Sequence, residues 1–207
     1  MALTTYTELK ASIADFLNRD DLTSVIPDFI SMAEANMNRD LRHWQMEKRV
    51  TASLTTQFTA IPSDFLEGVR LALNTPGTAP LEVVGSYEIS KLRAEIANTT
   101  GQPRFYTILD GSIEVMPSPD QSYTLEMLYY SKLEPLSDVN ANNWVLLGNP
   151  DLYVYGALLH AAPYLQADER IAVWSTLYAK AAQSLNQESE KARTGGSGRR
   201  MKIRSYQ

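Results

Sequence analysis

The predicted fold depends on Asn149-Pro150-Asp151-Leu152-Tyr153-Val154-Tyr155-Gly156-Ala157-Leu158-Leu159. In this segment the chain returns to helical periodicity after a long β-rich stretch. Asn149 is a favourable N-cap residue, and Pro150 suits the first helical position. Apolar side chains then recur at helical spacing as far as Ala162, until Pro163 interrupts the pattern. Since the chain also begins with helical patterns, this segment predicts a helical bundle that is divided by an inserted β-rich region.

Helical patterns precede and follow this segment. Residues 5–20 begin with a capping box, in which Thr5 and Glu8 each satisfy a backbone N–H of the first turn. Residues 24–43 form a second pattern with Pro27 in its first turn, and the matched apolar stripes of these two helices favour an antiparallel hairpin. A long last helix is predicted after residue 168, with an apolar stripe made of Ile171, Trp174, Leu177, Tyr178, Ala181 and Leu185.

Between these helices the period changes to that of β-strands from Lys48 onward. The clearest signal is a hairpin of residues 105–109 and 112–116 around Asp110-Gly111, a pair favoured in turns that need positive φ. Residues 88–97 are more helical. The other predicted strands are 49–54, 57–61, 65–73, 81–87 and 123–133, and they predict a small sandwich or barrel.

The fold class predicted from these patterns is α+β. A helical bundle is built from N- and C-terminal helices, and it carries an inserted β-rich subdomain and an extended C-terminal arm. The predicted divisions are an N-terminal helical hairpin at 1–47, the β-rich insert at 48–135, the C-terminal helices at 136–192, and the arm at 193–207.

Composition narrows the possible functions of this 207-residue chain. It contains no cysteine, which excludes disulfides and thiolate chemistry and suits an intracellular origin. The first residues lack a basic region followed by an apolar run, so we expect no secretion signal. Because no apolar stretch approaches the roughly 20 residues of a membrane helix, we expect a soluble protein.

Residue patterns for catalysis or metal binding are weak. His43 and His160 are the two histidines, and neither has a second histidine at metal-ligand spacing, so both are interpreted as structural or surface residues. The acidic pairs Asp20-Asp21, Asp64 with Glu67, and Glu188 with Glu190 are interpreted as turn or solvated groups. The loop 138–143 lacks the central Gly and closing Glu of a calcium loop. The sequence therefore predicts a protein that is not an enzyme and holds no metal or cofactor.

The last 17 residues, Lys191–Gln207, carry six basic side chains and no acid, whereas residues 1–190 carry 13 basic and 24 acidic ones. Gly195-Gly196-Ser197-Gly198 is typical of a flexible hinge rather than a phosphate-binding loop. Beyond this hinge, Met201, Ile203 and Tyr206 are interleaved with charges over too few residues to form a core. This composition favours an arm that becomes ordered on a protein partner. The alternative is a tail that binds nucleic acid. The acidic body disfavours this alternative because it opposes close approach of a duplex.

Several stretches together resemble one known family. The most characteristic is residues 149–159, which lead into Ala162-Pro163-Tyr164-Leu165. The other stretches are Tyr6–Lys10, Ile26–Ile30, Glu34–Arg42, Ile61–Glu67 and Tyr123–Tyr130. In this order they resemble the adaptor (head-to-tail connector) proteins of tailed bacteriophages, and the resemblance covers nearly the whole chain.

The resemblance implies a structural virion protein that assembles in the host cytoplasm into a ring, usually of twelve copies, at the virion neck. Such a ring would join the portal protein to a tail nozzle or tail-completion protein, with no membrane partner. Genomic DNA would pass through its channel without sequence-specific binding. The resemblance assigns portal docking to Arg193, Arg199, Arg200, Met201, Lys202, Ile203, Arg204 and, with the rest of the arm, Tyr206. The alternative function is a nucleic-acid-binding packaging or head-completion factor that uses the same basic tail.

Overall fold

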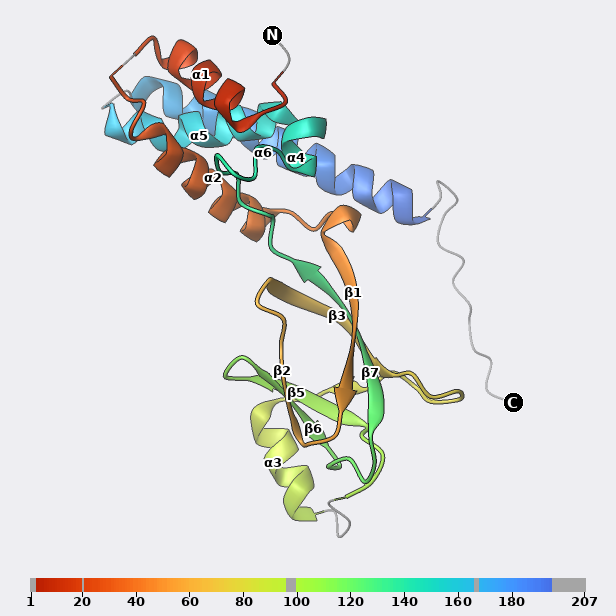
Figure 1. Cartoon of the computed structure of the whole chain (residues 1–207). Helices are drawn as coiled ribbons and strands as arrows, with labels where there is room; N and C mark the ends of the chain where they lie inside the picture. The colour runs from red at the N-terminus through yellow and green to blue at the C-terminus, as the bar shows by residue number, and fades with distance from the viewer. Residues whose placement is uncertain (1–2, 20, 96–99, 166–167, 195–207) are drawn as a thin grey trace. The chain divides into compact units, whose positions relative to one another are not determined.

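The computed structural model describes residues 3–19, 21–95, 100–165 and 168–194. The chain divides into two units, one formed by residues 1–45 and 133–207 and the other by residues 46–132. The first unit is helical where it is described, and the second contains the strands (Figure 1). The predicted α+β class is therefore confirmed.

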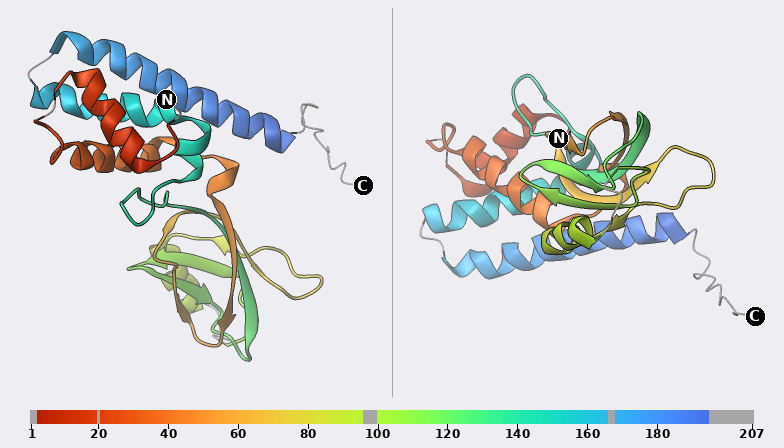
Figure 2. Two further views of the ribbon diagram at one scale, coloured as in Figure 1. Left: turned by 45° about the horizontal axis from the view of Figure 1, so that its top comes forward. Right: turned by 90° about the horizontal axis from the view of Figure 1, so that it is seen from below.

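The helical unit contains α1 (Tyr6–Leu17), α2 (Ile26–Asp40), α4 (Trp144–Gly148), α5 (Pro150–Tyr164) and α6 (Asp168–Thr194). Helix α5 packs against each of the other four. Its side chains are buried around its circumference, among them Leu152, Tyr153, Val154 and Leu158, and such a helix belongs at the centre of a bundle. In the right-hand view of Figure 2, α2 and α5 lie between α1 and α6.

Local chemistry explains where these helices begin. Thr5 and Glu8 form the predicted capping box of α1, with the Thr5 hydroxyl accepting from Glu8 N–H and the Glu8 carboxylate accepting from Thr5 N–H. Helix α2 has Pro27 in its first turn, as predicted. At the centre of the bundle Gly156 lets α5 approach α2 closely, since a Cβ built on this residue would lie 3.0 Å from Ala33 Cβ.

The second unit contains two sheets and one helix among its described residues. A three-stranded sheet has the order β1-β7-β3, with β1 (Glu47–Leu54), β3 (Phe65–Leu73) and β7 (Tyr123–Ser131) antiparallel. The other sheet has the order β2-β6-β5-β4, formed by β2 (Phe58–Ala60), β6 (Ser112–Met116), β5 (Phe105–Leu109) and β4 (Glu82–Val83). Helix α3 (Ser86–Glu95) packs against β5.

A shared apolar core joins these two sheets. Leu125, Met127 and Tyr129 alternate along β7 and pack in one cluster with Ile113 and Val115 of β6. The β5–β6 hairpin turns at Asp110 and Gly111, whose φ angles of 49° and 67° are both positive, as the Asp-Gly pair predicted.

The structure corrects three local predictions and adds one helix that was not predicted. Residues 81–87 are not one strand, because only Glu82 and Val83 pair with β5 and α3 begins at Ser86. The five-residue helix α4 was not predicted, since it is too short to show a period. Pro163 lies inside the last turn of α5 instead of ending it. Helix α6 continues to Thr194, two residues into the range expected to form the arm. A 3₁₀ turn covers Trp44–Met46.

Candidate functional site

The C-terminal end of α6 carries the one predicted docking residue that the structure describes. Arg193 lies in the exposed last turn of α6 together with Lys191, where basic side chains favour the negative end of the helix dipole. The other predicted docking residues lie outside the described residues; they are Arg199, Arg200, Met201, Lys202, Ile203, Arg204 and Tyr206. The structure therefore locates the root of the predicted arm.

This root is tied to the chain that leaves α2. The Asn186 side chain accepts a hydrogen bond from Arg42 N–H at 2.9 Å and donates one to the Asp40 carbonyl at 2.9 Å. One turn further along, the Ser189 hydroxyl accepts from Trp44 N–H at 2.9 Å. Side chains in the last turns of α6 thus hydrogen-bond to backbone groups of residues 40–44. These hydrogen bonds leave fewer buried polar groups unpaired.

An aromatic group lies at the same place. The buried His43 ring stacks on Trp144 at 4.8 Å between ring centroids, and the Trp44 ring lies 5.5 Å away. His43 Nδ1 accepts a hydrogen bond from Gln45 N–H, so the neutral ring carries its proton on Nε2. Burial lowers the pKa of His43, and the positive charge of Arg193 lowers it further against the opposing effect of Glu188. Nε2 has no hydrogen-bond partner among the described residues.

The chain that returns to the helical unit is held by α2. The Asn38 side chain accepts a hydrogen bond from Leu133 N–H at 2.8 Å, and Glu34 Oε1 accepts one from Leu136 N–H at 2.8 Å. Glu34 and Asn38 are four residues apart, so they share one face of α2. Residues 133–136 are therefore bonded to α2 in the way that residues 40–44 are bonded to α6.

Glu34 is also the centre of a buried polar network. Its Oε1 accepts from the Tyr153 hydroxyl at 3.0 Å, and that hydroxyl accepts from Asn143 Nδ2 at 2.6 Å. Asn143 Oδ1 in turn caps α4 by accepting from Leu146 N–H. Burial raises the pKa of Glu34, although the hydrogen bonds from Leu136 and Tyr153 act in the opposite direction. The network joins α2, α4 and α5 through one carboxylate.

The acidic residues weighed as catalytic candidates make structural contacts. Asp64 accepts from Lys48 Nζ at 2.7 Å and from the Tyr129 hydroxyl at 2.8 Å. The hydrogen bond from Lys48 is the main cause that lowers the pKa of Asp64, whereas burial raises the pKa of Tyr129 to about 12, with Asp64 adding to the shift. Glu67 lies on β3 opposite Tyr130 of β7.

The other candidates are dispersed over the helical unit. Asp21 pairs with Arg19 at 2.6 Å, and Asp20 lies outside the described residues. Glu188 and Glu190 lie near the end of α6. His160 Nε2 lies 2.7 Å from Asn36 Nδ2 in a hydrogen bond between α5 and α2. Over the described ranges, no group of three or more metal-ligating side chains comes together.

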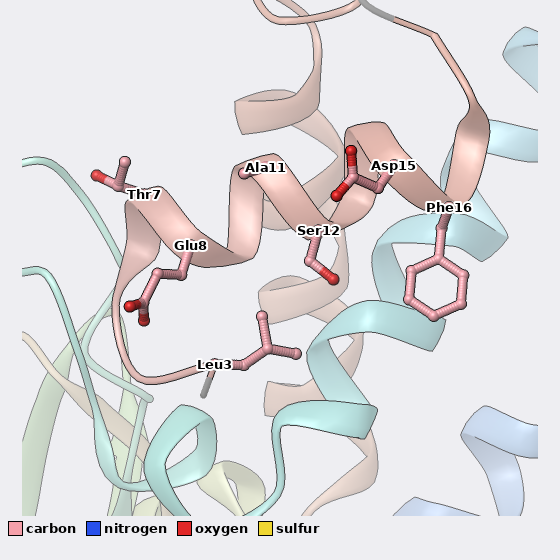
Figure 3. A pocket seen from close by; sticks show the side chains of 7 residues that line it. All are labelled: Leu3, Thr7, Glu8, Ala11, Ser12, Asp15 and Phe16. Atoms are coloured by element: carbon pink, nitrogen blue, oxygen red, sulfur yellow. The ribbon is translucent and has the colours of Figure 1, made fainter. Parts of the chain in front are cut away.

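A groove of about 400 Å³ runs along the outer side of α1 (Figure 3). Apolar or small residues line most of it, and its two charged residues are both acids; the lining includes Leu3, Ala11, Ser12, Phe16, Glu8 and Asp15. The Phe16 side chain is 54% exposed in this groove. In the part of the chain that the structure describes, no helix is long and apolar enough to cross a membrane.

The side chains that hold residues 40–44 and 133–136 were not identified from the sequence. A usable signal was present, because Glu34 interrupts the apolar stripe of α2 between Ile30 and Met37, and Ser189 continues the buried spacing of Ala182 and Leu185 on α6. Polar residues on an otherwise apolar face indicate buried hydrogen bonds. Their backbone partners are more than 90 residues away in sequence, so the signal did not name them.

Comparison with known proteins gives the class of this chain. Residues 4–201 match the family model described as SU10 adaptor protein, which is a phage adaptor family. No curated protein matches the sequence. The match covers both units and the greater part of the basic C-terminal segment. The chain therefore belongs to the SU10 adaptor protein family, whose members are structural adaptors of the bacteriophage virion neck.

Proposed function

We propose that this protein forms a ring of twelve copies that joins the portal to the tail and continues the DNA channel. Its basic C-terminal arm, residues 195–207, would grip the portal together with Arg193 at the end of α6, and a tail nozzle or tail-completion protein would bind the opposite face. Family membership supports an adaptor with portal and tail partners. It also supports a structural role rather than an enzymatic one.

One observation carries the docking part of this proposal. The exposed basic residues Lys191 and Arg193 end α6 and lead into a segment that holds Arg199, Arg200, Lys202 and Arg204 without a single acid. Because Asn186 and Ser189 hold this end of α6 to residues 40–44, the arm starts from a fixed point. A fixed starting point reduces the freedom that the arm loses on binding.

A ring would strengthen this contact. When one arm docks, the arms of neighbouring copies are held near their own sites, and the effective concentration for each later docking step rises. The acidic body, with 24 acids against 13 basic residues outside the tail, supports passage of DNA without tight binding, because negative surfaces repel phosphates.

The test is a charge reversal in the arm. The double variant Arg199→Glu/Arg200→Glu is compared with Arg104→Glu/Lys132→Glu, which changes the net charge equally at two exposed sites of the other unit. We expect the arm variant to bind purified portal rings at least tenfold more weakly, while the control binds normally. The opposite outcome is that the arm variant still binds portal rings but loses its affinity for DNA, with DNA binding that depends steeply on salt. In that case the nucleic-acid-binding alternative is correct and the docking proposal fails.

A further inference from the structure

The outer side of α1 combines an apolar surface with negative charge. In Figure 3, Leu3, Ser12 and Phe16 lie along one edge of α1 and Ala11 lies on the other edge; all four line the groove. Its charged residues are Glu8 and Asp15. Hydrogen bonds from the backbone and hydroxyl of Thr4 are the main causes that lower the pKa of Glu8, so this residue keeps its negative charge at neutral pH.

The outward side of α6 carries two exposed basic residues beside apolar ones. Tyr178, Ala182 and Leu185 are buried, whereas Val173 and Leu177 lie on a different side and are 57% and 36% exposed. Val173 and Leu177 are four residues apart, so they form one apolar ridge along the helix. Helical spacing places the exposed residues Arg170 and Lys180 on either side of this ridge.

These two surfaces lie on opposite sides of the helical unit. Helix α1 packs against α2 and α5, and α6 packs against α5. The right-hand view of Figure 2 shows α2 and α5 between α1 and α6. A contact from the α6 ridge of one copy to the α1 groove of the next would therefore use a different surface on each partner. A contact of this type can be repeated from copy to copy and can close into a ring.

We propose that the α6 ridge of one copy binds in the α1 groove of a neighbouring copy. Val173 and Leu177 then contact Phe16 and Ala11, and the basic residues beside the ridge face the acids of the groove. This inference rests on the proposed ring and specifies its subunit contact. Two grooves placed face to face would bring acids together, and two ridges would bring basic residues together. Both symmetric pairings are disfavoured by repulsion, whereas the groove–ridge pairing is attractive.

The test is a charge exchange within one chain. Asp15→Lys places a positive charge in the groove, and Arg170→Glu/Lys180→Glu makes the ridge negative. Glu8 is left unchanged because it caps α1. Phe16→Ser removes apolar surface from the groove. Val139→Ser is the matched control, because Val139 is 99% exposed and lies outside both surfaces.

The readout is the number of copies bound to each purified portal ring. Mass photometry measures this number over a range of protein concentrations. We expect Asp15→Lys, Arg170→Glu/Lys180→Glu and Phe16→Ser to raise the concentration needed for full occupancy at least tenfold. The chain that combines Asp15→Lys with Arg170→Glu/Lys180→Glu regains at least part of this loss, and Val139→Ser fills rings normally. Normal filling by Asp15→Lys and Phe16→Ser, or a combined variant no better than its parents, would overturn the contact.

This result is separable from the docking proposal. The groove and ridge variants keep an intact arm, so single copies should still bind portals when the protein is scarce. If the arm reversal Arg199→Glu/Arg200→Glu leaves portal binding unchanged, the docking proposal fails. If only the charge exchange has no effect, the subunit contact alone fails.

Discussion

The hydroxyl of Ser189 on α6 accepts a hydrogen bond from the backbone N–H of Trp44, over 2.9 Å. Ser189 is only 1% exposed, and the hydrogen bond itself is partly buried. The contact fixes the last turns of α6 to the chain that leaves α2. It lies five residues before the end of α6, and the proposed arm follows that end.

Ser189→Ala removes this acceptor. We expect the free energy of unfolding to fall by about 0.5–1.5 kcal/mol, which is the usual net contribution of one hydrogen bond. Ser184→Ala is the control, because Ser184 is an exposed residue of the same helix. Its stability should change by about 0.5 kcal/mol or less. Urea unfolding followed by circular dichroism measures both, and equal stability of the two variants would show that the Ser189 contact contributes nothing.

Glu34 leads to a different prediction, because its two hydrogen bonds offset part of the free-energy cost of burying its charge. Glu34→Ala leaves Leu136 N–H and the Tyr153 hydroxyl without this acceptor, and we expect a loss of about 1–3 kcal/mol. Glu34→Gln keeps an acceptor oxygen without the charge, so it should be much less harmful. Glu134→Gln, at an exposed position within residues 133–136, serves as the control in the same unfolding assay.

The same carboxyl sets a pH dependence. Since burial raises the pKa of Glu34, the folded protein holds this proton more tightly than the unfolded chain does. The contribution of Glu34 to stability is therefore greatest below the unfolded pKa and declines as pH rises through the folded pKa. The difference in stability between wild type and Glu34→Gln should shift against wild type as pH rises above 4.5, the ordinary pKa of this side chain. A difference that is constant, or that shifts toward wild type as pH rises, would contradict this assignment.

Asp64 should behave in the opposite way with pH. Its pKa is lowered, so its stabilising effect is present above the unfolded pKa and is lost as pH falls through the folded pKa. At neutral pH we expect Asp64→Ala to cost about 1–3 kcal/mol, mainly because the buried Tyr129 hydroxyl loses its acceptor. In a Tyr129→Phe background most of this cost should disappear. A double-mutant cycle measures the coupling, and strictly additive effects would refute it.

Gly156 tests the packing at the centre of the bundle. Besides Ala33, a Cβ on this residue would lie 3.4 Å from the ring of Tyr178. Gly156→Leu must displace α2 or α6, and we expect a loss of about 3 kcal/mol, at the upper end of the range for overpacked sites. At Gly148 no atom lies within 4 Å of such a Cβ, so Gly148→Leu is the matched control. If both variants melt at the same temperature, the close approach of α5 to α2 is wrong.

The order of helices and strands could be predicted because each longer element carries its own period or terminal signal. The capping box at Thr5 and Glu8 and the turn at Asp110-Gly111 act within a few residues, and both were found. The strand predicted at 81–87 was mostly wrong, because the apolar run containing Val83 and Val84 suggested a strand while Gly85 and Ser86 already lead into α3. Local propensity did not show that β4 has a partner over only two residues.

The contacts that organise the helical unit could not be predicted in the same way. Glu34 and Ser189 reach backbone groups far along the chain, and such pairs depend on how the helices pack rather than on any local pattern. The groove at Phe16 and the ridge at Val173 also required a structure, because helical periodicity alone does not distinguish an apolar residue that stays exposed. The basic tail is the reverse case, since its composition favoured an arm that docks on a protein partner, and the family resemblance then implied the portal as that partner.

The most direct test of the central claim uses purified portal rings and two forms of this protein. One is the full chain, and the other ends after Thr194, where α6 ends. Both should unfold at the same temperature. Electron microscopy and co-sedimentation should show the full chain on the portal and the shortened chain free in solution. Binding of the shortened chain with the affinity of the full chain would contradict the claim that residues 195–207 hold the portal.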